Sequence, residues 1–107
     1  MWVVKRSGLR EPFDRAKVVE GVRAACKYRP VTDEQMEQLA QEVEDALRAQ
    51  TSEPTSQQVG VAVLERLKAL DDVAYLRFAS VYKGFEEAGD FQREAGLLTK
   101  TTEPKRK

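Results

Sequence analysis

The stretch from Val3 to Lys17, VVKRSGLREPFDRAK, restricts the fold of this chain more than any other. It contains two short runs that favour β-strands, Trp2–Arg6 and Leu9–Phe13, joined by Ser-Gly. Glycine supplies the positive φ that a tight turn requires, so the pattern predicts a β-hairpin. Two short strands are only marginally stable alone, and the hairpin therefore needs a helical surface to pack against.

Amphipathic segments after the hairpin predict that surface. Asp14 is placed to cap a helix that ends near Lys27. The run Thr32–Gln35 matches a capping box before a second helix, which ends near Ala49, and Ser56 is placed to cap a third. The apolar residues at helical spacing are Val18, Val19, Val22, Ala25 and Cys26, then Met36, Leu39, Ala40, Val43, Ala46 and Leu47, then Val59, Val63, Leu64, Leu67 and Leu70. Each stripe predicts one buried helix face.

A fourth helix is predicted from Val73 to about Phe85, with Asp71 or Asp72 as its cap. Its apolar arc is wide, which predicts deep burial of this helix and of its aromatic residues. The arc consists of Val73, Leu76, Phe78, Ala79, Val81, Tyr82 and Phe85.

Asp90 is the candidate cap of a short last helix through Leu98, and the basic stretch Thr99–Lys107 is predicted to be a disordered tail. The expected fold is mainly α: a short N-terminal hairpin forming a lid on a four-helix bundle, followed by a short C-terminal helix and the tail. We expect residues 1–91 to form the functional domain and residues 92–107 to form the short helix and tail.

The overall composition excludes several classes of function. The 107 residues carry no net charge, and no apolar run is long enough to span a membrane, so we expect a cytoplasmic protein without a membrane partner. Cys26 is the single cysteine and there is no histidine, which leaves no internal disulfide, no Cys/His zinc site and no imidazole base. Cys26 lies on an apolar stripe and is predicted to be a core residue. We therefore expect no metal site and no catalytic residues.

The charge is unevenly distributed. The first 17 residues contain five bases and two acids, whereas residues 33–53 contain seven acids and one base. Lys5, Arg6 and Lys17 could hold phosphates, and the helix beginning at Ser56 could add free amides. Successive strand residues point to opposite faces, so Lys5 and Arg6 can share a ligand only if the hairpin is twisted or the strand ends near them. Glu11 among these cations balances their charge or accepts from a ligand hydroxyl or amine.

The motif Val-Val-Lys-Arg-x-Gly-x-x-Glu-Pro-Phe-Asp-x-x-Lys resembles the start of an ATP-cone, the regulatory nucleotide-binding domain of ribonucleotide reductases. A second motif, DVAYLRFASVY from Asp72 to Tyr82, is similar to the cone of the bacterial transcriptional repressor of ribonucleotide reductase genes. The turn at Arg29-Pro30-Val31 and the pair Val59-Gly60 fit that family too. The resemblance runs from about Val3 to about Phe91.

This resemblance implies a domain that binds ATP or dATP, with Mg²⁺ carried on the phosphates, and does not consume the nucleotide. The implied roles place Val3 and Val4 along the base, Glu11 near the base or ribose, and Lys5, Arg6 and Lys17 on the phosphates. Ser56 matches a hydroxyl residue that closes the site. Tyr82 matches an aromatic residue near the nucleotide, although its place in the apolar row supports a core role equally well.

The repressor family also carries an N-terminal zinc ribbon built on four cysteines, which binds DNA. With Cys26 as its single cysteine, this chain lacks that ribbon, so we expect it to contact DNA only through a module outside the chain. The expected function is sensing of adenine nucleotides by a homo-oligomer whose assembly state depends on the nucleotide. Two alternatives stay open: a regulatory ATP-cone fragment of ribonucleotide reductase itself, and a small basic-hairpin protein that binds nucleic acid.

Overall fold

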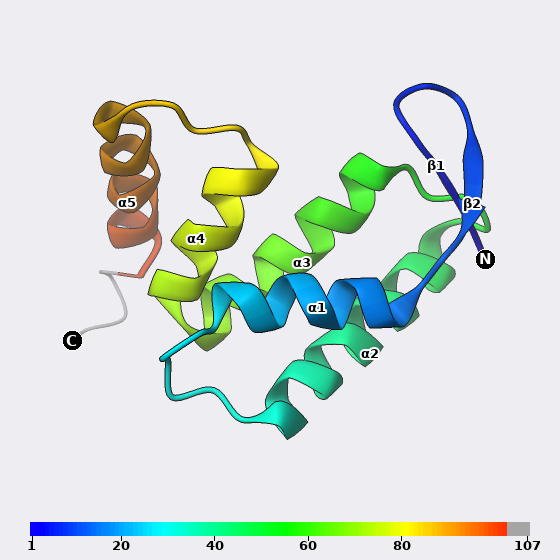
Figure 1. Cartoon of the computed structure of the whole chain (residues 1–107), viewed down its shortest axis with the longest axis horizontal. Helices are drawn as coiled ribbons and strands as arrows, with labels where there is room; N and C mark the ends of the chain where they lie inside the picture. Colours follow the sequence, from blue (N-terminus) through cyan, green and yellow to red (C-terminus); the bar gives the residue numbers. More distant parts are fainter. Residues whose placement is uncertain (103–107) are drawn as a thin grey trace.

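The computed structural model describes residues 1–102, and of residues 99–102 only the helical backbone. A two-stranded antiparallel hairpin of β1 (Trp2–Val4) and β2 (Arg10–Pro12) precedes five helices. The helices are α1 (Arg15–Ala25), α2 (Asp33–Gln50), α3 (Ser56–Leu70), α4 (Asp72–Tyr82) and α5 (Ala88–Thr102). Figure 1 shows the hairpin at one end of the bundle and α5 at the other. The predicted mainly α fold with an N-terminal hairpin is confirmed.

The hairpin is closed by a three-residue loop. The amide of Gly8 donates to the carbonyl of Lys5 at 2.8 Å, and the amide of Lys5 donates to the carbonyl of Leu9 at 2.7 Å. Gly8 has a φ of 93°, the left-handed conformation that this kind of loop requires at its last position. The prediction of a hairpin turn at Ser-Gly is therefore confirmed, and β1 ends at Val4, before the two basic residues.

The predicted caps of α1 and α2 are confirmed. Asp14 accepts a hydrogen bond from the amide of Ala16, and Thr32 forms the full capping box with Gln35. For α4, Asp71 is the cap and accepts from the amide of Ala74. Asp71 also accepts from the guanidinium of Arg29. Burial alone would raise the pKa of Asp71, but the hydrogen bonds from Arg29 and from backbone amides hold that pKa below its ordinary value.

Two predicted caps are wrong. Thr55, not Ser56, caps α3, because the Thr55 hydroxyl accepts from the amide of Gln58 and the Gln58 side chain accepts from the amide of Thr55. Ser56 is the first residue inside the helix. Asp90 lies within the first turn of α5, where its carboxylate accepts from the amides of Glu86 and Glu87 in the preceding loop.

The core lies where α1, α2, α3 and α4 meet, and its largest fully buried side chains include Val22, Val43, Val63 and Leu67. The predicted stripes of the first three helices supply most of it. Cys26 belongs to this core with 2% of its surface exposed, and burial raises the pKa of its thiol. Its predicted role as a core residue is confirmed.

The last two helices differ from their predictions. α4 ends at Tyr82, and Gly84 then adopts a φ of 68°. Of the predicted apolar arc only Ala79 is fully buried, the other members are partly buried, and Val81 is 83% exposed, so the prediction of deep burial is wrong for most of the arc. The helix that was predicted to end at Leu98 continues to Thr102, four residues into the predicted tail. The rest of that tail lies outside the described residues.

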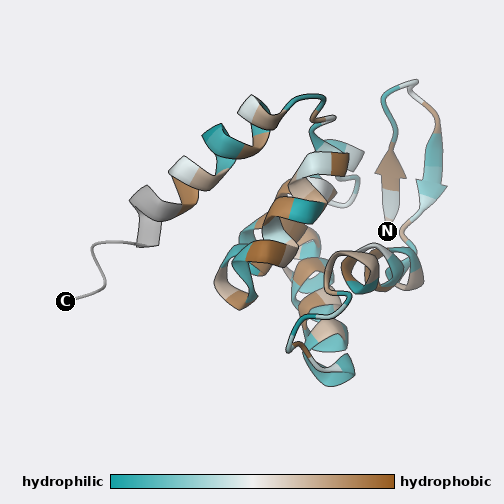
Figure 2. Ribbon diagram, turned by 60° about the vertical axis from the view of Figure 1, so that its left-hand side comes forward, coloured by the Kyte–Doolittle hydropathy of each residue, from teal (hydrophilic) through white to brown (hydrophobic). Residues whose placement is uncertain are grey.

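α5 packs against α4, and Figure 2 shows it extending away from the other helices. The hydroxyl of Tyr75 donates to Glu94 at 2.5 Å, and the Lys83 ammonium pairs with the same carboxylate at 3.2 Å. Glu94 is only 6% exposed, and Leu98 joins the core. The predicted boundary after residue 91 falls inside this helix. Among the described residues, no helix combines the length and apolarity that a membrane crossing needs.

Candidate functional site

Three of the predicted site residues meet beside the hairpin. Glu11 on β2 lies between two lysines, with one carboxylate oxygen 3.6 Å from Nζ of Lys5 and the other 3.8 Å from Nζ of Lys17. Lys5 follows β1 directly, and Lys17 is in the first turn of α1, so three different elements contribute. All three side chains are partly exposed, which leaves the lysines accessible to an anionic ligand. The group carries a net positive charge.

Arg6 lies in the loop of the hairpin, next to this group. Its side chain is exposed and makes no hydrogen bond or ion pair with any other residue in the described part of the chain. Because β1 ends at Val4, Lys5 and Arg6 are not constrained to opposite faces of a strand. The condition under which the two cations could share a ligand is therefore met.

Val3 and Val4 hold the hairpin against the loop before α3. Val3 is buried, and the amide of Val4 donates to the carbonyl of Pro54 at 2.9 Å. A parallel bridge between Val4 and Thr55 continues this contact and places Ser56 beside β1. Figure 1 shows the N-terminal end of α3, the positive end of its dipole, directed toward the hairpin.

Tyr82 closes the same end of the bundle from α4. Its hydroxyl donates to the carbonyl of Gln57 at 2.8 Å, and its ring stacks on Phe78 with the two ring centroids 6.3 Å apart. The ring lies so close to α3 that a Cβ on Gly60 would be 2.0 Å from one of its atoms. Gly60 therefore permits the close approach of the two helices. Tyr82 is half-buried, so it contributes to packing and also presents part of its surface to the solvent near α3.

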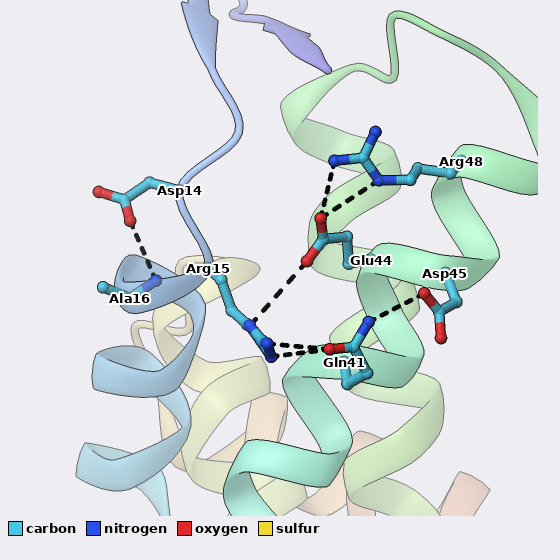
Figure 3. Close-up of polar contacts among 7 residues, drawn as sticks. All are labelled: Asp14, Arg15, Ala16, Gln41, Glu44, Asp45 and Arg48. Carbon is cyan, nitrogen blue, oxygen red and sulfur yellow. Dashed lines mark hydrogen bonds and ion pairs between the residues drawn. The ribbon is translucent and has the colours of Figure 1, made fainter.

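The other bases of the hairpin region serve the fold. Figure 3 shows the Arg15 guanidinium pointing toward α2, where it donates to the side chain of Gln41 at 2.8 Å and lies 3.9 Å from Glu44. Gln41 and Glu44 are held in turn by Asp45 and Arg48 on the same helix. This network locks the start of α1 onto α2, and it leaves Arg15 unavailable to a ligand.

Arg10 has a comparable structural role on the opposite side of the hairpin. Its guanidinium pairs with Glu53 in the loop before α3 and lies over the ring of Trp2. Sequence reasoning missed both this anchor and the Val4–Pro54 hydrogen bond, because no local pattern relates residues so far apart in the chain. The cap at Thr55 could have been found, since Thr55 to Gln58 matches the capping-box pattern.

The donor set fits a polyphosphate chain better than a metal ion. Lys5, Arg6 and Lys17 supply three cations against one carboxylate. Within the described residues, no group of three or more His, Cys, Asp or Glu side chains is arranged to hold a metal ion. A phosphate group bound by these cations would also lie near the positive end of the α3 dipole.

Comparison with known proteins relates the chain to a family. The family model described as "ATP cone domain" matches residues 1–88. The protein named "Transcriptional repressor NrdR" from Acidothermus cellulolyticus is 62% identical over 96 residues, which cover 89% of this chain and 56% of that protein. Its namesake from Mycobacterium sp. strain KMS is 60% identical over 97 residues, which cover 90% of this chain and 63% of that protein. The match thus spans between 56% and 63% of the length of these relatives. The family match extends over most of the sequence, including both motifs and every predicted site residue, and the chain therefore belongs to the ATP-cone domain family.

Proposed function

We propose that this chain is the adenine-nucleotide sensor of a transcriptional repressor of ribonucleotide reductase genes, acting in the cytoplasm and without catalysing a reaction. The observation that carries the proposal is the group of Lys5, Glu11 and Lys17 beside the exposed Arg6, within a chain of the ATP-cone family. The close relatives bear the name of a repressor and not that of an enzyme. ATP and dATP are the proposed ligands.

In the proposed complex, the phosphates bind Lys5, Arg6 and Lys17. The base lies along Val3 and Val4, and Glu11 contacts the base or ribose after exchanging a lysine partner for a ligand group. Ser56 and Tyr82 close the site from α3 and α4. Mg²⁺ bound to the phosphates would neutralise part of their charge and keep most of its waters. All of these residues precede residue 91, the end of the predicted nucleotide-binding unit.

The proposed output is a change of assembly. A nucleotide can shift an equilibrium between oligomers only by its difference in affinity for them. ATP and dATP differ by one hydroxyl, and a neutral hydrogen bond contributes roughly 0.5–1.5 kcal/mol net, so a single contact gives modest discrimination. Coupling to assembly, or binding of two nucleotides, would amplify it. DNA would be contacted by a zinc ribbon attached to this domain.

Calorimetric titration with ATP and dATP tests the site. We expect Lys5→Ala and Arg6→Ala each to weaken binding roughly 10- to 150-fold, because a charge-assisted hydrogen bond contributes about 1.5–3 kcal/mol. Lys27→Ala is the matched control, since Lys27 is an exposed cation beyond the opposite end of α1. Unchanged affinity in both hairpin variants would remove the site assignment.

Light scattering coupled to size exclusion tests the output. The apo, ATP and dATP forms of the chain should differ in average mass. Identical assemblies in all three, measured at nucleotide concentrations that saturate the site, would refute sensing through assembly while leaving nucleotide binding intact.

A further inference from the structure

A groove of about 900 Å³ lies between α2 and the C-terminal end of α3. None of the eight predicted site residues lines it. Its apolar part includes Leu39, Ala69 and Leu70, and α2 contributes a rim of carboxylates. An apolar hollow of this size with a charged rim is a surface that another chain segment could cover.

The carboxylates of the rim are largely unneutralised. Glu34 and Glu37 make no hydrogen bond or ion pair with any described residue, and the contact of Glu42 is with the uncharged amide of Gln38. By contrast, Asp33 at the end of the groove is paired with Arg23. Glu34 and Glu37 are three residues apart and therefore neighbours on α2, and Glu42 lines the same groove further along the helix. Two arginines, Arg15 and Arg66, also line the groove, but each is paired with an acid outside the lining, Arg15 with Glu44 and Arg66 with Glu65. The groove thus combines an apolar floor with an excess of carboxylates over free cations among the described residues.

Among the basic segments of the sequence, one carries three adjacent cations that could complement this rim. The last five residues are Glu-Pro-Lys-Arg-Lys, with three adjacent cations from Lys105 to Lys107. Long basic side chains can lay their methylene stems on an apolar surface while their charged groups reach a polar rim. We propose that this groove binds the basic segment Lys105–Lys107 of a second copy of the chain.

The arrangement of the helices favours a second copy over the same molecule. α5, which leads to the basic segment, packs on α4, and in both views it stands at the edge of the molecule. The groove lies on α2 and α3. A contact between two different surfaces is heterologous, and such contacts form rings or open chains. The inference rests on the proposed function only because both require the chain to self-associate, and its test contains no nucleotide.

Sedimentation velocity of the full chain without nucleotide tests the contact. We expect self-association at low salt that is lost at about 1 M salt, where the Debye length is roughly 3 Å. A groove variant, Glu34→Gln with Glu37→Gln, and a tail variant, Lys105→Gln with Arg106→Gln and Lys107→Gln, should each associate at least about tenfold more weakly. Glu20→Gln with Glu86→Gln is the control, because these exposed carboxylates lie outside the groove.

Mixing the two variants gives the decisive measurement. The groove variant retains an intact basic segment and the tail variant an intact groove, so the mixture should form dimers at a concentration at which each variant alone stays monomeric. A monomeric wild-type chain, wild-type association in either variant, or a mixture without dimers would overturn the proposal. Circular dichroism of each variant checks that the substitutions leave the helices folded. None of these results depends on nucleotide binding, which the titration above tests separately.

Discussion

Replacement of Glu11 by glutamine should strengthen the binding of phosphate chains. The carboxylate lies 3.6 Å from Lys5 and 3.8 Å from Lys17, so it competes with any anion for both ammonium groups. Two unit charges about 4 Å apart attract by roughly 1 kcal/mol in water, and exposed pairs contribute about 0.2–1 kcal/mol after screening. Removing two such pairs should favour an anionic ligand by about 0.4–2 kcal/mol, which is about a 2- to 30-fold gain in affinity.

Two ligands separate the two roles left open for Glu11. Tripolyphosphate offers only phosphate oxygens, whereas ATP adds the base and ribose. If Glu11 only balances charge, Glu11→Gln should strengthen both ligands by the same factor. If its carboxylate also accepts from a ribose hydroxyl or an exocyclic amine, tripolyphosphate should bind more tightly while ATP gains less or loses affinity, because that charge-assisted bond is worth roughly 1.5–3 kcal/mol.

Isothermal titration at low salt measures both affinities, with Glu20→Gln as an exposed control on α1. Thermal unfolding should differ little between Glu11→Gln and wild type, since the broken ion pairs are partly exposed. Unchanged affinity of Glu11→Gln for tripolyphosphate would refute the argument, because it would show that phosphates do not compete for Lys5 and Lys17.

Three further predictions concern stability, each measured by urea denaturation. Glu94→Ala should cost about 1–3 kcal/mol by leaving the buried hydroxyl of Tyr75 without an acceptor. Burial alone would raise the pKa of Glu94, but its hydrogen bonds hold that pKa below the ordinary value. This stabilisation should therefore be present above about pH 4.5 and lost on further acidification, a dependence that Glu94→Gln should lack. Thr55→Ala should cost about 1 kcal/mol through loss of the α3 cap, whereas an equal loss in Ser56→Ala would contradict the assigned cap. Gly60→Ala should cost about 1–3 kcal/mol by displacing the ring of Tyr82, and a neutral effect would show that this ring moves freely.

Local chemistry explains why the first three helices and the hairpin could be predicted. The Asp14 cap and the Thr32–Gln35 capping box satisfy amides within three residues, and Gly8 supplies a φ that few other residues adopt. Such devices act over one turn, so the pattern that reveals them is continuous in the sequence. The error at Ser56 came from a choice between adjacent hydroxyl residues, where the glutamine three positions after Thr55 was the deciding feature.

The positions of the candidate site residues could be predicted less well. The proximity of Lys5, Glu11 and Lys17 follows from a hairpin that leads directly into a helix, and all three lie within the first 17 residues of the sequence. Which bases are available to a ligand did not follow, because Arg15 is held by Gln41, 26 residues away. Partners at such separations leave no periodic trace in a single sequence.

By itself, therefore, the sequence determined the hairpin, the capped helices, their apolar faces and the family resemblance, because each depends on residues a few positions apart. The tertiary structure alone decided how these parts meet. The hydrogen bond from Val4 to Pro54 anchors the hairpin to the start of α3, and the bond from Tyr75 to Glu94 docks a helix that local patterns had ended too early. Both depend on groups brought together only when the core assembles, since burial makes an unpaired polar group costly and so selects partners across the chain.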